Sequence, residues 1–317
     1  MRPLPPALVL AAGLGTRLLP LTSLRAKPAL PLGGEPLIAH ILRWLRQAGI
    51  TDAIVNLHHR PETITAAIGD GRAFDLAVRY SWESPLLGSG GGPRRAFALV
   101  PDDELLIVNG DTLTDVDLPS LVTHHRQSNA LVTMALIENP HPERYGGVQV
   151  EHGSVTGFTA RGQGGLHFVG VQIARREAFA DAVDGQPSES VREIYPALMR
   201  RHADAIGAWA TKGSFSDIGT AWSYLKTALA VAGAAGTGLV NPTATISPTA
   251  RIERSVVWND VTVEDGAELI ECVVADRARI PAGARYYRSV IMAGPGTDTT
   301  GTAGVAVPMT SAAQELP

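Results

Sequence analysis

The first half of the chain alternates short apolar runs with longer segments whose apolar residues recur every three or four positions. Residues 7–12 form a wholly apolar run, which predicts a buried strand. Residues 36–48 carry their apolar side chains on one helical face, with Pro36 suited to the first turn and Gly49 to the C-terminal cap. Further strands are expected at 53–57, 77–80, 104–108 and 130–137, and further helices at 61–68, 93–100 and around 118–127.

This alternation predicts an α/β fold. Strands separated by crossover helices form a doubly wound, mostly parallel sheet. In such sheets, ligands bind outside the carboxyl ends of the strands. The segments that follow Ala12 and Val108 are therefore the first places to look for a site.

The pattern changes near residues 228–240, where an Ala-, Gly- and Thr-rich linker precedes an internal repeat. The tripeptides Ser255-Val-Val, Cys272-Val-Val and Ser289-Val-Ile recur at equal intervals. Three recurrences in register favour the coils of a β-helix over ordinary hairpins. We therefore expect a catalytic domain at 1–232, a short β-helix at 233–292 and a disordered tail at 293–317, which has no core pattern.

Composition narrows the class of protein. The net charge of −4 gives no basic field for nucleic acid or an anionic membrane, so phosphate binding has to come from local groups. Cys272 is the only cysteine, which excludes a disulfide within the chain and any multi-cysteine metal site. The apolar run near the N-terminus is too short for a membrane span and lacks the flanks of a signal peptide. A cytoplasmic enzyme is the expectation.

The segment after the first strand is suited to binding phosphate. In Gly13-Leu-Gly15-Thr16-Arg17, glycines allow a tight turn that presents N–H groups to phosphate oxygens. Arg17 adds a planar cation that grips two oxygens, and Lys27, further along the chain, supplies a second cation. A Walker A motif would need Gly-Lys-Ser/Thr at the end of this segment, and a Rossmann fingerprint would need a third glycine at Leu18.

The whole segment resembles the sugar-1-phosphate nucleotidyltransferases, which make GDP-mannose, dTDP-glucose, UDP-sugars and ADP-glucose. The resemblance lies in the glycine segment, in Pro20-Leu-Thr22, in Lys27-Pro28 and in residues 32–38, and it extends to about residue 230. The family usually has proline where this chain has Ala26. Because the family often appends a left-handed β-helix, the resemblance gives the expected repeat that hand.

The resemblance implies the substrates, a cofactor and residue roles. An NTP and a sugar 1-phosphate give an NDP-sugar and pyrophosphate, with Asp111 and Asp217 holding Mg²⁺. Arg17 would hold the leaving pyrophosphate, and Lys27 the α-phosphate, so these four residues are the expected catalytic set. Two hard carboxylates together with phosphate oxygens and water form a normal Mg²⁺ site. The residues expected to contact the nucleotide are Leu10, Ala11, Ala12, Gly13, Gly15, Thr16, Arg17, Lys27, Glu83, Gly88, Ser89, Gly110 and Asp111.

The base and the sugar stay open at this point. The glycine-rich segment 87–92 is expected to lie against the base as a loop before a helix, and Glu83 either accepts hydrogen bonds from guanine or is a solvated surface residue. Gly147, Arg161 and Gly170 are expected on the sugar-phosphate side, although the family commonly has Glu-Lys-Pro where Arg161 lies. GTP with mannose 1-phosphate is the first hypothesis. The alternative is a uridylyl- or thymidylyltransferase acting on another sugar, since Gly90-Gly-Gly92 and Phe168-Val-Gly170 also resemble uridylyltransferases that act on N-acetylmuramate 1-phosphate.

Two rival functions start from the same residues. A regulatory subunit would keep the pocket without turnover, but all four expected catalytic residues are present. A β-helix acyltransferase would need a histidine base, yet all nine histidines lie at or before His202. The repeat is therefore expected to be structural and to pack on the catalytic domain or on another subunit.

Overall fold

The computed structural model describes residues 3–234, 236, 238–294 and 304–309. The chain divides into two compact units, one of residues 1–14 with 38–216 and one of residues 15–37 with 217–317. The expected boundary between residues 232 and 233 does not coincide with this division, because residues 15–37 and 217–232 group with the repeat. Each unit is described separately below.

The first unit is built on a nine-stranded mixed sheet. Strands β5, β4, β1 and β6 are parallel neighbours, as the sequence predicts. The expectation of a mostly parallel sheet is wrong beyond β6, because β11 pairs antiparallel with both β6 and β8. In sheet order the strands are β5 Ala77–Trp82, β4 Asp52–Leu57, β1 Ala7–Leu10, β6 Glu104–Asn109, β11 Leu166–Arg175, β8 Val132–Glu138, β12 Ile206–Ala210, β10 Ser154–Thr159 and β9 Gly147–Glu151.

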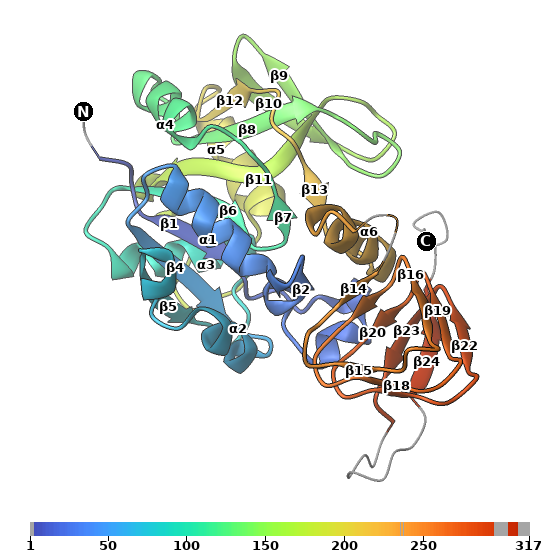
Figure 1. Ribbon diagram of the computed structural model, residues 1–317. Coiled ribbons are helices and arrows are strands. Elements are labelled where there is room, and N and C mark those ends of the chain that lie inside the picture. The colour runs from blue at the N-terminus through green and yellow to red at the C-terminus, as the bar shows by residue number, and fades with distance from the viewer. Residues whose placement is uncertain (1–2, 235, 237, 295–303, 310–317) are drawn as a thin grey trace. The chain divides into compact units, whose positions relative to one another are not determined.

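Helices pack against this sheet over a continuous apolar core. Helix α1 lies across the viewer's side of β1 in Figure 1. Leu8, Ile54 and Ile107, from three neighbouring strands, are buried to within 1% in the core that includes Phe97 and Tyr195. Among the described residues, no helix is long and apolar enough to cross a membrane. The helices of this unit are α1 Leu37–Gln47, α2 Pro61–Ile68, α3 Gly88–Ala96, α4 Leu118–Gln127 and α5 Tyr195–Arg201.

One helix begins earlier than the sequence predicts. The expected helix at 93–100 is α3 Gly88–Ala96, followed by a 3₁₀ turn, η5 Phe97–Leu99. The glycine run expected to be a loop therefore forms the first turns of a helix. By contrast, α2 and α4 have the expected bounds, and Asp117 caps α4 by accepting a hydrogen bond from Ser120 N at 3.1 Å.

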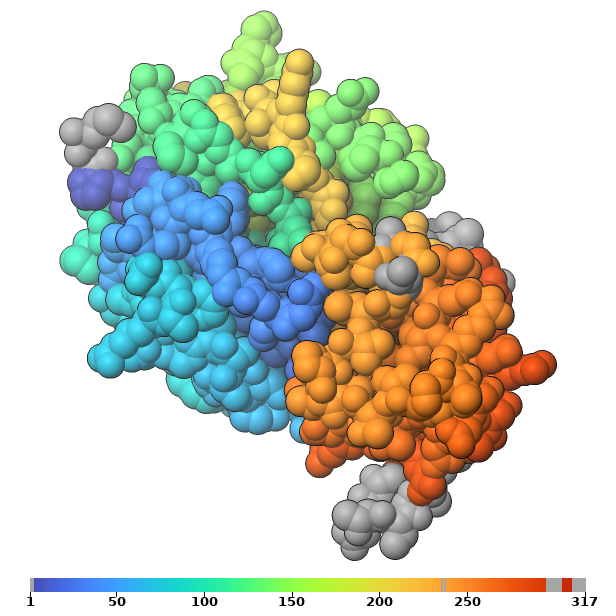
Figure 2. Space-filling model, in the orientation of Figure 1, coloured from blue at the N-terminus to red at the C-terminus, as the bar shows by residue number. Residues whose placement is uncertain are grey.

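The second unit contains the repeat, in which each strand pairs in parallel with its counterpart in the next copy. Val256 pairs with Val273, and Val273 with Val290, which confirms the register read from the sequence. These strands belong to one continuous orange-to-red body in Figure 2. The three short sheets run β14 Leu239–Val240, β17 Val256–Val257, β20 Val273–Val274, β23 Ser289–Met292; β15 Thr245–Ile246, β18 Thr262–Val263, β21 Arg279–Ile280; and β16 Arg251–Glu253, β19 Glu268–Ile270, β22 Arg285–Tyr287.

The segment after the repeat is partly ordered. Strand β24 Val305–Pro308 pairs antiparallel with β23, so the expectation of disorder does not hold for these residues. Much of the expected tail, residues 295–303 and 310–317, lies outside the described residues.

Candidate active site

The carboxyl ends of β1 and β6 meet as the sequence predicts. Gly110 N donates to Leu10 O at 2.9 Å, and a side chain at Gly110 would lie 2.7 Å from the same oxygen. Glycine is therefore required for this close approach, which places Asp111 directly beyond the end of β1. Ala11 and Ala12 are buried, and the chain then emerges to the surface at Gly13.

In the second unit, the glycine turn is held by a threonine. Gly15 has a φ of 63°, and a side chain there would lie 2.8 Å from Thr22 Cγ2. The buried Thr22 hydroxyl donates to Gly15 O at 2.9 Å. Thr16 and Arg17, in the 3₁₀ turn η1 Thr16–Leu18, are exposed, so the guanidinium of Arg17 faces solvent.

Lys27 and Asp217 come together in this same unit. Lys27 Nζ lies 3.9 Å from Asp217 Oδ1, and their side chains are only 9% and 12% exposed. Lys27 opens the 3₁₀ turn η3 Lys27–Ala29, while Asp217 ends the short strand β13 Ser216–Asp217 just before α6 Ala221–Val231. The structure thus brings together two of the four expected catalytic residues.

Asp111 is partly exposed in the first unit, and the chain that follows it is tied to the chain that precedes Asp217. Thr114 Oγ1 donates to Ser214 O at 2.6 Å, and Ser214 N donates to the Asp115 carboxylate. That backbone hydrogen bond holds the pKa of Asp115 below its usual value. Across the part of the chain that the structure describes, no three His, Cys, Asp or Glu side chains cluster as a ready-made metal site. Mg²⁺ would therefore need substrate phosphates and water as further ligands.

The glycines of α3 are explained by packing. Residues 186–190 run against the start of the helix, with Gly90 N donating to Ser188 O at 2.8 Å and Ser188 N donating to Leu87 O at 2.9 Å. A side chain at Gly91 would lie 2.7 Å from Gln186 O. Ser89 Oγ is also engaged, since it donates to Glu189 at 2.8 Å and accepts from Ser190 N at 2.9 Å. Gly88 opens the helix and lies against the same segment.

Glu83 is not a solvated surface residue. It is 4% exposed, and its two carboxylate oxygens accept from Asn56 Nδ2 at 2.7 Å and from Leu87 N at 2.8 Å. Asn56 Oδ1 accepts in turn from Ala11 N at 2.6 Å. Sequence reasoning missed Asn56, although an amide near the carboxyl end of an otherwise apolar strand was a usable signal.

The residues expected on the sugar side lie in different surroundings. Gly147 is buried in β9 and donates to Thr159 Oγ1 at 3.1 Å. Gly170, in β11, packs so closely on Asn109 that a side chain would lie 2.6 Å from its amide nitrogen. Arg161 is exposed in the turn between β10 and β11. Gly170 is thus next to the strand end that carries Asp111.

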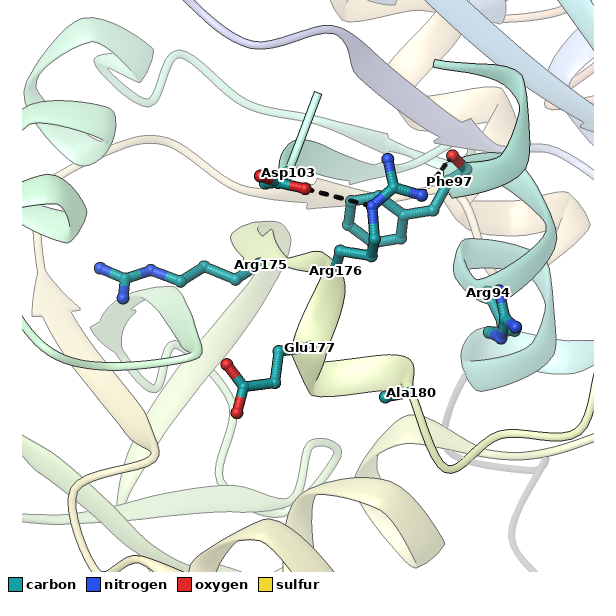
Figure 3. A pocket seen from close by; sticks show the side chains of 7 residues that line it. All are labelled: Arg94, Phe97, Asp103, Arg175, Arg176, Glu177 and Ala180. Atoms are coloured by element: carbon teal, nitrogen blue, oxygen red, sulfur yellow. Dashed lines mark hydrogen bonds and ion pairs between the residues drawn. The ribbon is translucent and has the colours of Figure 1, made fainter. Parts of the chain in front are cut away.

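A separate hollow of about 540 Å³ lies at the other end of β6. Arg176, one of its lining residues, donates to Phe97 O at 2.7 Å and pairs with Asp103 at 3.3 Å (Figure 3). Asp103 precedes β6, whereas Asp111 follows it. The hollow therefore opens at the amino end of the strand, away from the edge where parallel sheets bind ligands.

Comparison with known proteins agrees with this geometry. The sequence model of the family "Nucleotidyl transferase" matches residues 6–233. The chain is 30% identical over 292 residues to "Mannose-1-phosphate guanylyltransferase" of Mycobacterium tuberculosis, covering 87% of this chain and 81% of that protein. It is 35% identical over 240 residues to "N-acetylmuramate alpha-1-phosphate uridylyltransferase" of Neisseria meningitidis, covering 72% of this chain and 98% of that protein.

Solved structures share the fold. HddC from Yersinia pseudotuberculosis, in complex with GMP-PN, has a TM-score of 0.62 and 22% identity, covering 71% of this chain and 98% of that one. A putative glucose-1-phosphate thymidylyltransferase from Bacillus anthracis has a TM-score of 0.64 and 19% identity, covering 72% and 95%. With the glycine turn at Gly15, the Lys27–Asp217 pair and above all the family match over residues 6–233, the chain belongs to the nucleotidyl transferase family.

Proposed function

We propose that this protein transfers a nucleotidyl group from an NTP to a sugar 1-phosphate, with GTP and mannose 1-phosphate preferred. The observation that carries the proposal is the buried Lys27–Asp217 pair, at 3.9 Å, behind the glycine turn. A cation and a carboxylate held together next to a phosphate-binding turn suit a reaction in which charge moves between phosphates. The relative from M. tuberculosis, named as a mannose-1-phosphate guanylyltransferase, supports the choice of base and sugar.

The roles of the cations follow from their exposure. Arg17 is exposed and can meet a mobile group, so it holds the leaving pyrophosphate. Lys27 is only 9% exposed, where a fixed charge acts more strongly than in water, so it stabilises the α-phosphate. Arg161, on its exposed turn, takes the phosphate of the incoming sugar.

Asp111 and Asp217 are the carboxylates that we assign to Mg²⁺. Hydrogen bonds of Ser214 with Thr114 and Asp115 support this assignment, because they join the chain shortly after Asp111 to the chain shortly before Asp217. The donor set fits, since carboxylates are preferred Mg²⁺ ligands when substrate phosphates complete the shell. When bound, the metal supplies positive charge that neutralises the phosphates.

The reaction is an in-line displacement. An oxygen of the sugar phosphate forms a bond to the α-phosphorus of the NTP, and the bond from that phosphorus to the pyrophosphate oxygen breaks. The nucleophile is already ionised at neutral pH, so no general base is needed. Catalysis therefore rests on the orientation of the two substrates and on charge stabilisation by Arg17 and Lys27.

A second candidate is uridylyl transfer to N-acetylmuramate 1-phosphate or a similar sugar. It is favoured by the N. meningitidis relative, of which the chain covers 98%. It is also favoured by Gly90-Gly-Gly92 and Phe168-Val-Gly170, which resemble the uridylyltransferases that act on this sugar phosphate. The two candidates share the reaction and differ in base and sugar.

We further propose that residues 1–232 make up the catalytic region and that the repeat in 233–292 is a left-handed β-helix. The family match, which ends at residue 233, supports the first point. The second is supported by parallel pairing at the same constant interval in all three short sheets.

The test is a substrate matrix. ATP, GTP, CTP, UTP and dTTP are each offered with mannose, glucose, N-acetylglucosamine and N-acetylmuramate 1-phosphates, and pyrophosphate release is followed with Mg²⁺ present. We expect the highest kcat/KM for GTP with mannose 1-phosphate. A maximum with UTP would select the second candidate, and no release with any pair would refute nucleotidyl transfer.

A further inference from the structure

A buried chain of hydrogen bonds joins the ends of β1 and β4 to the start of α3. Ala11 N donates to Asn56 Oδ1 at 2.6 Å, Asn56 Nδ2 donates to Glu83 Oε1 at 2.7 Å, and Leu87 N donates to Glu83 Oε2 at 2.8 Å. Asn56 is 3% exposed and Glu83 is 4% exposed. All four residues belong to the first compact unit.

The direction of each hydrogen bond is fixed by the backbone. Because the N–H of Ala11 can only donate, the Asn56 atom that faces it is the carbonyl oxygen. The amide NH₂ group of Asn56 therefore points at Glu83, whose carboxylate accepts at both oxygens. Gly92 leaves room for this pair, since a side chain there would lie 3.0 Å from Glu83 Oε1 and 3.1 Å from Asn56 Nδ2.

The two ends of this chain are the segments expected to contact the nucleotide. Ala11 is the first residue after β1 and leads to Gly13. Leu87 immediately precedes the first turn of α3, which contains Gly88 and Ser89. Hydrogen bonds to a buried carboxylate are short, directional and strong, so they hold their donors at a fixed separation. Loss of one partner leaves a buried polar group unsatisfied.

We propose that Asn56 and Glu83 are positioning residues. They hold the segment after β1, residues 11–13, and the start of α3 at the spacing that an NTP requires. Glu83 acts through the backbone of Leu87 and does not touch the base. This inference rests on the nucleotidyl transfer proposed above. It predicts that loss of the pair weakens the use of every NTP alike, whereas a base-reading glutamate would affect guanine selectively.

The pair can be tested by reversing its polarity. In Glu83→Gln, an NH₂ group must face either Asn56 Nδ2 or Leu87 N, so two donors meet. In Asn56→Asp, two carboxylates meet. In the double variant, the aspartate accepts from Ala11 N and from the glutamine NH₂ group, and the glutamine oxygen accepts from Leu87 N. Every partner is then satisfied, and one negative charge remains, as in the wild type.

We expect each single variant to lower kcat/KM for GTP by about 10- to 100-fold, with the ratio of GTP to UTP use unchanged. The double variant should recover to within about threefold of the wild type with the same ratio. Glu62→Gln, a side chain 64% exposed on α2, controls for the loss of one negative charge and should leave activity unchanged. A folded double variant that stays 10-fold impaired, or that loses preference among bases, overturns the positioning role.

Two further measurements keep the outcome decisive. If the single or double variants fail to fold, as judged by circular dichroism, Gly92→Ala displaces the pair by a few tenths of an ångström and should lower kcat/KM for all NTPs alike. Unchanged kinetics in that variant would overturn the proposal. Calorimetric binding of GTP and UTP tests the positioning role separately from nucleotidyl transfer. If the wild type binds both nucleotides without turnover, nucleotidyl transfer is refuted, and the affinities of the single and double variants still test the pair. A wild type that binds neither nucleotide overturns both.

Discussion

Single residues explain why the turn at Gly15 could be predicted from the sequence. Gly15, Thr22 and Lys27 lie close to one another along the chain, and their contacts are local. A positive φ at Gly15 and the hydroxyl of Thr22 are direct consequences of the residue types. The hydrogen bonds of Glu83 could not be predicted in this way, because its partner Asn56 lies far from it in the sequence, on another strand.

Lys27→Ala should lower kcat by about 100-fold or more and change the KM for NTP much less, because the cation meets charge that develops as the bond breaks. Steady-state kinetics at saturating sugar 1-phosphate measure this, with Lys27→Arg as the charge-retaining control. Thermal melting checks that Asp217, left without its lysine, does not unfold the second unit. A raised KM with unchanged kcat would make Lys27 a binding residue only.

His167 should make stability depend on pH. Its side chain is buried, and its ring packs against Tyr145 and Phe215 at centroid distances of 4.6 and 4.3 Å. Burial lowers its pKa to about 4, below the value of about 6.5 for the unfolded chain. Between these two values the unfolded state binds more protons, so stability falls as pH falls through this window, by up to about 1.4 kcal/mol per pH unit.

His167→Phe should reduce this slope and raise stability at pH 7, since it replaces a buried polar ring in an aromatic cluster by an apolar one. Urea unfolding at pH 7.5, 6.5 and 5.5 gives the slope for each protein. Some dependence remains in the variant because burial also lowers the pKa of His125 to about 4. Parallel slopes for variant and wild type would refute this account of His167.

At the scale of elements, periodicity predicted most strands and helices, and long-range contacts decided the rest. Helices α2 and α4 have their expected bounds because apolar spacing and a capping aspartate are local signals. Helix α3 begins earlier than expected because residues 186–190 pack on its glycines, and nothing near Gly88 in the sequence records those contacts. The antiparallel placement of β11 between β6 and β8 is likewise determined by contacts between distant segments of the chain.

Gly91→Ala should destabilise the protein despite the helix propensity of alanine. In an exposed helix the change would stabilise by about 1 kcal/mol. Here the new methyl group would lie 2.7 Å from Gln186 O and 3.0 Å from Leu87 Cβ, and overpacking of this kind costs about 1–3 kcal/mol. Urea unfolding should therefore show a net loss of stability. A higher midpoint would mean that residues 186–190 do not press on α3.

In the whole molecule, each of the two compact units is made of two separate stretches of the chain. A single domain boundary placed along the sequence therefore cannot describe this division. Within the second unit, residues 15–37 contact the repeat although the two segments lie far apart in the sequence. Arg25 donates to both carboxylate oxygens of Asp276 at 2.8 and 2.7 Å, and Trp258 Nε1 donates to the buried Tyr224 hydroxyl at 2.9 Å. The repeat thus packs on residues that flank Lys27 and follow Asp217.

Asp276→Asn should lower stability by about 1 kcal/mol and reduce kcat, because Arg25 closely precedes Lys27 and the bidentate pair is only 23% and 18% exposed. Thermal unfolding and steady-state kinetics measure the two effects. Glu268→Gln breaks a more solvated ion pair of the same repeat, with Arg285 78% exposed, and serves as the matched control. Equal losses of stability and kcat in the two variants would mean that the repeat does not support the turn that carries Lys27.

In the proposed reaction, the α-phosphorus of an NTP is transferred to a sugar phosphate. Phosphorus-31 NMR follows this directly when GTP, mannose 1-phosphate and Mg²⁺ are mixed with the protein. The sugar phosphate signal should decline as the signals of a sugar-linked diphosphate and of free pyrophosphate grow in equal amounts. Adding pyrophosphate to GDP-mannose should regenerate GTP. Release of inorganic phosphate without a sugar-linked diphosphate would contradict nucleotidyl transfer.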